Sequence, residues 1–223
     1  MKKILCIGNV SYDITIVTED YPTENIKYRV DNRVAGGGGP SSNAAYLLGK
    51  WGMNTSFAGT IGNDEYGRKI LDEFKSVNVN TTNVQIDKYE NTTSSFILVN
   101  KKNGSRTIFS YRPNSLKLKK KIKTRASVIL IDGQEYDASV YAIKNNQKAI
   151  SIIDAGRNTD KVIALCKMVN YVVCSKEFAE SYTNMKIDLS NPSTIKSIFQ
   201  VMEHDFKNVL ITLESKGCLY RLD

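Results

Sequence analysis

The stretch VAGGGGPSSNAAYLLGKWG, residues Val34 to Gly52, decides how this chain is interpreted. Four glycines lead into a proline, two serines and an asparagine, and apolar residues at helical spacing follow. Pro40 suits a first helical position, where its missing N–H is not needed, so we expect a helix from Pro40 to Lys50. Glycine-rich turns that open a helix often bind an anion.

The glycine run matches neither of two common phosphate-binding motifs. A Walker A loop needs its lysine at a helix start, but Gly49 and Lys50 lie at the helix end and Trp51 follows them. The dinucleotide fingerprint follows the first strand, yet Gly8 is followed by NVSYD. The backbone N–H groups, with Asn43 one turn inside the helix, suit a neutral polyhydroxy ligand. Tight packing of the chain explains the glycines equally well, and the residues alone leave both explanations open.

The remaining sequence alternates between strand-like and helix-like segments. KKILCIG reads as a buried first strand, and from Ser127 to the C-terminus apolar runs alternate with amphipathic segments. This alternation predicts a mostly parallel sheet with helices on both faces. Two β-rich segments, near 13–36 and 92–112, interrupt it, and the second reads as a hairpin around KKNG. We expect them to form a small separate sheet inserted in one α/β domain over 1–223.

Composition narrows the classes of protein. Hydrophobic residues make up 41% and charged residues 24% of the 223, as in soluble globular proteins. No apolar run reaches the ~20 residues of a membrane span, and Asp13 follows the first apolar run too soon for a signal peptide. We therefore expect a cytoplasmic protein with no membrane partner. Its net charge is +8, but the basic run 116–125 has no aromatic residue to stack bases, so we expect a solvated segment and no nucleic-acid partner.

Histidine and cysteine usage excludes further chemistry. His204 is the only histidine, which rules out a histidine-rich metal site and catalysis by paired histidines. The four cysteines form no C-x-x-C pair. Cys6, Cys174 and Cys218 lie in apolar strand-like runs, and we expect them to be buried, reduced thiols.

Several motifs, in order and spacing over the whole chain, resemble the PfkB or ribokinase-like family of carbohydrate kinases. IGNVSYDIT resembles the family's first strand and turn, which ends in a sugar-binding aspartate, here Asp13. GGPSSN, Gly38 to Asn43, matches the sugar-binding motif G-G-x-x-x-N. LLGKWGMNTSFAGTIGNDEYG resembles the segment that follows this motif, and NVLITLESKGCLY resembles the strand and turn before the nucleotide loop. The resemblance implies a three-layer α/β sandwich with a small β-sheet lid.

The resemblance also implies site residues. As a carboxylate, Asp13 would accept charge-assisted hydrogen bonds from two adjacent sugar hydroxyls. Further implied substrate contacts are Gly38, Gly39, Asn43, Arg112, which would meet a carboxylate of the substrate, and Gln134. The implied nucleotide contacts are Ser175, Thr212 and Gly217, and Glu177 would lie near the magnesium ion.

The implied activity is transfer of the γ-phosphate of ATP, with magnesium, to a hydroxyl of a ketose, pentose or sugar acid. In the family the lid closes on the sugar and often pairs with a second lid in a homodimer. A nucleoside is an alternative substrate, and the sequence does not separate the two. SKEF places Ser175 and Phe178 where the family has asparagine and glutamate, and Glu214 replaces a glycine beside the phosphates, which its carboxylate would repel. These departures favour another alternative, a non-catalytic sugar-binding or regulatory remnant.

The family's catalytic G-A-G-D loop has no counterpart in the 223 residues, and the resemblance implies that it would lie beyond Asp223. Its glycine amides bind the moving phosphate, and its aspartate is the general base. IDAGRNTD, residues 153–160, echoes it only superficially. We therefore expect a C-terminally truncated kinase that has no catalytic base and is inactive as this chain. Nucleic-acid binding, based on charge alone, ranks last among the alternatives.

Overall fold

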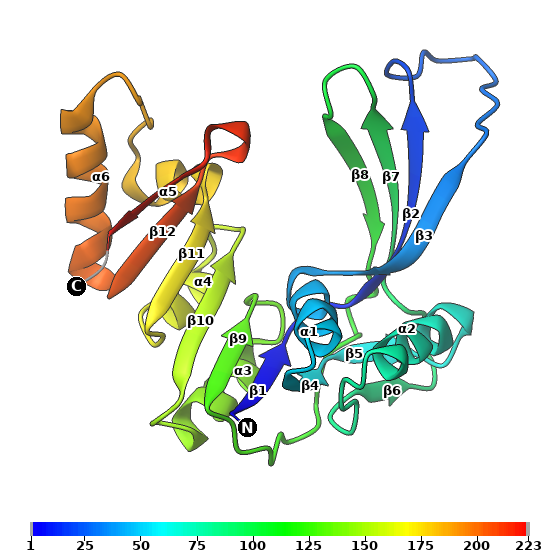
Figure 1. The fold of residues 1–223 in the computed structure, drawn as a ribbon, viewed down its shortest axis with the longest axis horizontal. Helices are drawn as coiled ribbons and strands as arrows, with labels where there is room; N and C mark the ends of the chain where they lie inside the picture. The colour runs from blue at the N-terminus through cyan, green and yellow to red at the C-terminus, as the bar shows by residue number, and fades with distance from the viewer. Residues whose placement is uncertain (1, 222–223) are drawn as a thin grey trace.

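The computed structural model describes residues 2–221 and shows a seven-stranded sheet from which a second sheet projects (Figure 1). The large sheet has the order β13-β12-β11-β10-β9-β1-β4. Every neighbouring pair is parallel except β12 and β13, which are antiparallel. The mostly parallel central sheet is thus confirmed. Its strands are β1 Lys3–Ile7, β4 Asn54–Ala58, β9 Val128–Ile131, β10 Ile150–Ala155, β11 Tyr171–Ser175, β12 Asn208–Thr212 and β13 Cys218–Arg221.

Six α-helices of the described region connect and cover these strands. They are α1 Pro40–Lys50, α2 Glu65–Ser76, α3 Tyr136–Asn145, α4 Asp160–Cys166, α5 Lys176–Thr183 and α6 Pro192–Asp205. Helix α1 has the predicted bounds and packs on β1 and β4, whereas α3 to α6 pack on β9 to β12. Across residues 2–221, every helix is too short or too polar to traverse a lipid bilayer.

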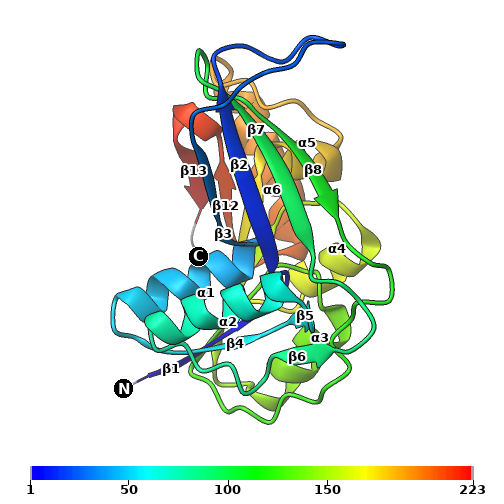
Figure 2. The ribbon, with the colours of Figure 1, turned by 90° about the vertical axis from the view of Figure 1, so that its right-hand side faces the viewer.

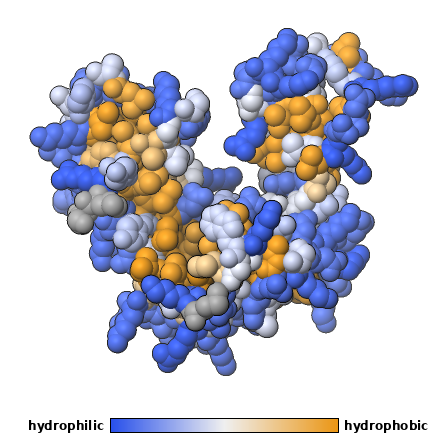
Figure 3. Space-filling model, viewed as in Figure 1, coloured by the Kyte–Doolittle hydropathy of each residue, from blue (hydrophilic) through white to orange (hydrophobic). Residues whose placement is uncertain are grey.

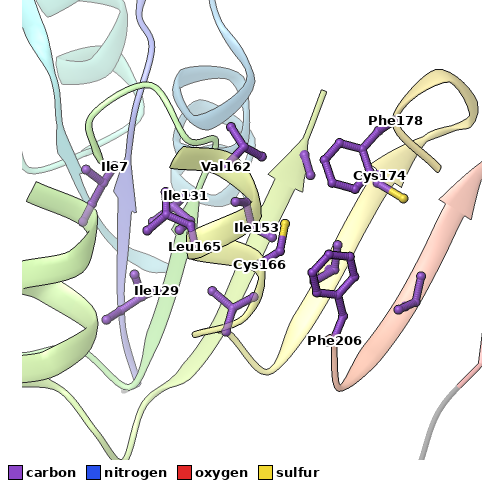
Figure 4. Packing of buried hydrophobic residues seen from close by; sticks show 14 of the residues in the cluster. Ile7, Ile129, Ile131, Ile153, Val162, Leu165, Cys166, Cys174, Phe178 and Phe206 are labelled. Carbon is purple, nitrogen blue, oxygen red and sulfur yellow. The ribbon is translucent and has the colours of Figure 1, made fainter. Parts of the chain in front are cut away.

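The apolar side chains form one buried cluster on each face of the sheet. Along β1, Leu5 and Ile7 point into the larger cluster, and Ile4 and Cys6 point into the smaller one, as the period of a strand requires. Figure 4 shows the larger cluster, in which isoleucines of β9 and β10 lie against side chains of α4 and α5. Each fully buried aliphatic side chain contributes about 1.5–3 kcal/mol to folding.

One half of the sheet is apolar on a face that no described helix covers. Ile152, Val173 and Leu210 lie on the face of β10, β11 and β12 opposite the larger cluster and remain partly exposed. Tyr220, paired with Leu210 across β13, is 66% exposed. Figure 3 shows apolar residues gathered over these strands. Parallel sheets are normally covered on both faces, so an apolar sheet face that is exposed to solvent is unusual.

The second sheet, which we call the lid, stands apart from the first (Figures 1 and 2). Its order is β3-β2-β7-β8, with β2 and β7 parallel and the outer pairs antiparallel. This confirms the separate sheet expected from the two β-rich segments. The predicted strand character of residues 26–32 was wrong, because β3 begins only at Arg33. The lid strands are β2 Ser11–Thr18, β3 Arg33–Gly38, β7 Ser94–Asn100 and β8 Arg106–Tyr111.

Other expectations need correction. TSFAGTIG divides at Gly59 into β4 and β5 (Thr60–Gly62), which pairs with β6 (Gln85–Asp87) in a third sheet. A side chain at Gly59, between the two strands, would overlap the Phe57 ring and the Gly8 carbonyl. Cys218 is exposed on the edge strand β13, contrary to expectation, because no strand lies beyond it in the described sheet.

The basic run 116–125 is only partly solvated, contrary to expectation. Leu116, Leu118 and Ile122 are buried, and the lysines between them are exposed. The run is therefore a strap fastened to the body of the protein by its apolar residues.

The catalytic G-A-G-D loop is expected after the C-terminal end of the given sequence. Asp223, beyond which the G-A-G-D loop is expected, lies outside the described residues. The placement of the catalytic base beyond Asp223 therefore stays a prediction.

Candidate functional site

Asp13 and Gly38 meet where the lid joins the body. They lie on neighbouring antiparallel strands, β2 and β3, in which Ser11 pairs with Gly38 and Asp13 with Gly36. The half-buried Asp13 carboxylate lies so close to Gly38 that a Cβ there would overlap it. The Ser11 hydroxyl donates to Asp13 Oδ1 at 2.8 Å. The motif glycine is therefore needed for the approach of a carboxylate, and tight packing of the backbone alone does not account for it.

Gly39 sets the start of α1 beside this carboxylate. Its φ of 99° is one that other residues rarely adopt, and a Cβ there would overlap the carbonyl oxygen of Asn9. Helix α1 has no side-chain cap of its own. The Ser41 N–H instead donates to Asp132 Oδ2 at 3.2 Å, from the end of β9. A residue far along the sequence therefore completes the glycine turn.

Asp132 is the site residue that sequence reasoning missed. Its Oδ2 also accepts the Asn9 N–H at 2.8 Å, and its Oδ1 accepts the Gln134 N–H at 3.0 Å. Burial raises the pKa of Asp132, and the hydrogen bonds from these N–H groups offset only part of that shift. One signal was available: Asp132 follows the apolar strand 127–131, and ligands bind at the carboxyl ends of such strands.

Asp154, near the carboxyl end of the adjacent strand β10, adds a further acid. Burial, and then the negative charge of Asp132, raise the pKa of Asp154. The described carboxyl edge of the sheet thus carries two acids that are easier to protonate than usual.

Asn43 lies on the other side of the glycine strand. It is exposed and lines a pocket of about 320 Å³ together with Tyr46 and Glu73, and neither Asp13 nor Gly38 lines that pocket. Glu73 Oε2 accepts the Gly37 N–H at 2.9 Å. The structure therefore brings Asp13, Gly38 and Gly39 together, and it places Asn43 in a neighbouring pocket.

The other two predicted substrate contacts lie near Asp132. Gln134 is exposed at the turn after β9, and its backbone N–H donates to Asp132. Arg112 donates to Asn9 Oδ1 at 2.8 Å and forms an ion pair with Glu135 at 3.0 Å. A contact between Arg112 and a substrate carboxylate stays a prediction.

The predicted nucleotide contacts gather at the carboxyl ends of β11 and β12. Ser175 and Thr212 are register neighbours on these strands. The Ser175 hydroxyl accepts the Phe178 N–H at 3.1 Å and so caps α5. The Thr212 hydroxyl donates to the Cys174 carbonyl at 3.2 Å. Gly217, with a φ of 88°, closes the turn between the short helix η1 (Glu214–Lys216) and β13.

A pocket of about 570 Å³ lies beside these residues and has mixed charge. Lys176 and Lys216 offer cations for phosphates, but Glu177, Asp188 and Glu214 line it as well. Glu214 has a φ of 55°, the left-handed conformation that suits the glycine it replaces. Among residues 2–221 no three His, Cys, Asp or Glu side chains come together as a metal site. The predicted nucleotide contacts thus lie beside a pocket of mixed charge, whose acids do not form a ligand set for a magnesium ion.

The motif around Gly62–Gly67 fastens the lid. Asp64 caps α2 by accepting the Gly67 N–H at 2.8 Å, and it also accepts the Thr92 N–H and hydroxyl at 2.8 and 2.6 Å. Burial acts to raise the pKa of Asp64, but the hydrogen bonds from Thr92 and Gly67 outweigh it and the pKa is lowered. Because Thr92 precedes β7, this motif anchors a lid strand.

Comparisons with known proteins identify relatives. Mouse (Mus musculus) ketohexokinase is 32% identical over 113 residues, which are 51% of this chain and 38% of that protein. The ribokinase of Staphylococcus aureus strain COL is 22% identical over 98% of this chain and 75% of its own length. For several relatives the match thus covers well under two thirds of their length, including 36% of the nucleoside kinase of Methanocaldococcus jannaschii.

Solved structures share the fold. A putative ribokinase from Agrobacterium tumefaciens superposes with a TM-score of 0.88 at 20% identity, covering 99% of this chain and 73% of that one. Arabidopsis thaliana ribokinase, solved with ribose and ATP, superposes with a TM-score of 0.80 at 19% identity over all of this chain and 75% of its own. The model of the pfkB family carbohydrate kinases matches residues 1–222. With the ribokinase-like fold, this match shows that the chain belongs to the pfkB family of carbohydrate kinases.

Proposed function

We propose that this chain forms the sugar-binding part of an ATP-dependent kinase that phosphorylates a hydroxyl of a ketose, pentose or sugar acid. The contact between the Asp13 carboxylate and Gly38 carries the proposal, because the glycine leaves the carboxylate room to lie beside open backbone. One oxygen of Asp13 accepts from Ser11, and the other is available to sugar hydroxyls. Gly38, Gly39 and Gln134 are the other proposed substrate contacts, and Asn43 is proposed as a contact from the neighbouring pocket that it lines.

ATP supplies the phosphoryl group when it is bound, and we place it in the pocket beside Ser175, Thr212 and Gly217. The position at the carboxyl ends of parallel strands and the two lysines of the pocket support this placement. Magnesium is part of the proposed reaction, with Glu177 as its predicted neighbour. We derive no step through the ion, because the acids of this pocket do not form a ligand set.

Residues 1–223 contain no G-A-G-D sequence, so we propose that the catalytic base and the anion hole lie beyond Asp223. The chain as given would bind sugar and transfer no phosphate. A non-catalytic sugar-binding or regulatory protein is a second candidate, favoured by Glu214 at the turn that would meet the phosphates. A nucleoside substrate is a third, supported by the similarity to an archaeal nucleoside kinase.

We also propose that the lid pairs with the lid of a second copy. One row across the lid contains Val34, Thr15, Ile97 and Ile108, on the same face as Asp13. Val34 is 70% exposed and Ile108 is 53% exposed, so this face has apolar surface to bury. A cytoplasmic location is proposed from the four free cysteines. Nucleic acid and membranes are not among the proposed partners.

Calorimetric titration of the purified chain tests the proposal with D-ribose, D-fructose, D-gluconate and adenosine. Binding of a sugar that is weakened in Asp13→Asn is expected, whereas Asp137→Asn, an exposed aspartate of α3, serves as the matched control. Binding of adenosine alone would favour the nucleoside kinase. Absence of binding by every compound at millimolar concentration would contradict a sugar site in this chain.

A further inference from the structure

Arg112 connects the lid to the body through three hydrogen bonds to protein groups. It follows β8 directly, and its Nη1 donates to Asn9 Oδ1 at 2.8 Å. Its Nη2 donates to the Leu116 carbonyl at 2.9 Å and to Glu135 Oε1 at 3.0 Å. The Arg112 side chain is 19% exposed and that of Glu135 is 5% exposed. A planar guanidinium that donates to three protein acceptors and is largely shielded from solvent is held in one orientation.

Asn9 links Arg112 to Asp132 and to the glycine turn before α1. Its backbone N–H donates to Asp132 Oδ2 at 2.8 Å. Its carbonyl oxygen packs so closely on Gly39 that a Cβ there would overlap it. Its side chain accepts from Arg112. A shift of Asn9 therefore moves the Asp132 carboxylate and the start of α1 together.

The same contacts join two of the connections between lid and body. Asn9 lies between β1 and β2, where the chain passes into the lid, and Arg112 lies where it returns after β8. Glu135 Oε2 accepts the Leu118 N–H at 2.9 Å, so the returning segment is held as well. The cross-link spans 103 residues of sequence between Asn9 and Arg112.

We propose that Arg112 is a positioning residue, which together with Glu135 fixes Asn9 and so sets the positions of Asp132 and Gly39 at the base of the lid. The effect on sugar affinity rests on the proposed function, and the effect on the free protein does not. This role differs from contact with a substrate carboxylate, because it uses the three N–H groups of the guanidinium that donate to protein acceptors.

Hydrogen–deuterium exchange on the free chain tests the geometric part. In Arg112→Lys, whose ammonium cannot serve three separated acceptors, exchange in segments 8–13 and 36–43 should rise about tenfold, as expected for one lost charged hydrogen bond. Glu135→Gln is the second variant, and it keeps the size of the side chain. Arg106→Lys, an exposed arginine on β8, is the matched control and should leave exchange unchanged. Unchanged exchange in both variants, or an equal rise in β11 and β12, would overturn the proposal.

Titration of the same variants with D-ribose, D-fructose and D-gluconate tests the effect on the site. If Arg112 acts by positioning, the variants should bind neutral and acidic sugars more weakly by the same factor. Weakening confined to D-gluconate would make Arg112 a ligand of the substrate carboxylate and overturn the positioning role. If the unsubstituted chain binds no sugar, the proposed function fails, and the exchange experiment still decides whether Arg112 positions Asn9.

Discussion

Asp13 and Gly38 lie on neighbouring lid strands, and the Asp13 carboxylate occupies the space that any side chain at residue 38 would need. Gly38→Ala should therefore displace the carboxylate and weaken sugar binding at least as much as loss of a charged hydrogen bond, about 1.5–3 kcal/mol. Gly156→Ala is the matched control, because nothing lies within 4 Å of the added methyl there. Calorimetric titration compares the sugar affinities of the two variants, and equal affinities would show that Gly38 has no role in sugar binding.

Asp13→Ala should weaken sugar binding by ~1.5–3 kcal/mol, because hydroxyls would lose a charged acceptor. The chain should still fold, with a modestly lower melting temperature, because the buried Ser11 hydroxyl loses the acceptor that Asp13 provides. Titration gives the affinity and scanning calorimetry the melting temperature. Equal affinity, or collapse of the fold, would make this aspartate a structural turn residue.

The stability of the chain should carry a pH dependence that comes from Asp132. Burial raises the pKa of Asp132 above its usual 3.8, so the folded state binds this proton more tightly than the unfolded state. Stability from this group is therefore full below pH 3.8 and is lost as the pH rises through the raised pKa. Asp132→Asn removes the titration and also lowers the pKa of Asp154, which the Asp132 charge raises.

Urea unfolding at intervals from about pH 4 to about pH 8 measures this effect. As the pH rises, the free energy of unfolding of Asp132→Asn should increase relative to that of the unsubstituted chain. The unsubstituted chain, measured over the same pH range, is the reference for this comparison. A constant difference for Asp132→Asn would contradict the raised pKa.

The uncovered face of β10 to β12 should bind apolar dyes. Anilinonaphthalene sulfonate fluorescence should rise in the presence of the folded chain, because this face leaves apolar surface in water. Val173→Thr, on this face, should lower the signal. Val172→Thr changes the neighbouring residue on the covered face, so it should lower stability and leave the signal unchanged. Equal signals from the two variants would place the dye elsewhere.

Residues 1–223 should show no sugar kinase turnover. Loss of a general base alone costs ~10²–10⁴-fold in rate, and the donors of the anion hole would be missing as well. A coupled assay of ADP release on pentoses, hexoses and sugar acids measures this. Robust turnover by the pure chain that is abolished in Asp13→Ala would show that a residue within 1–223 acts as the general base.

The sequence by itself determined the features that depend on near neighbours. Helix Pro40–Lys50, the alternation of strands and helices, and the β-rich segments follow from local spacing, and the structure agrees with them. Asp13 and the glycines of residues 38 and 39 were singled out by motifs, and the structure places them on neighbouring strands or beside them. Turn chemistry and periodicity involve residues only a few positions apart, so they can be read along the chain.

Only the tertiary structure decided which distant groups meet. Asp132 reaches Ser41 across 91 residues and Asn9 across 123, and no pattern along the chain marks either contact. The order of strands likewise set the hydrogen bond of Arg112 to Asn9 and its ion pair with Glu135. It also left Cys218 exposed on an edge strand. Burial, pKa and hydrogen-bond partners depend on what the fold packs around a residue, and that environment comes from segments far away in the sequence.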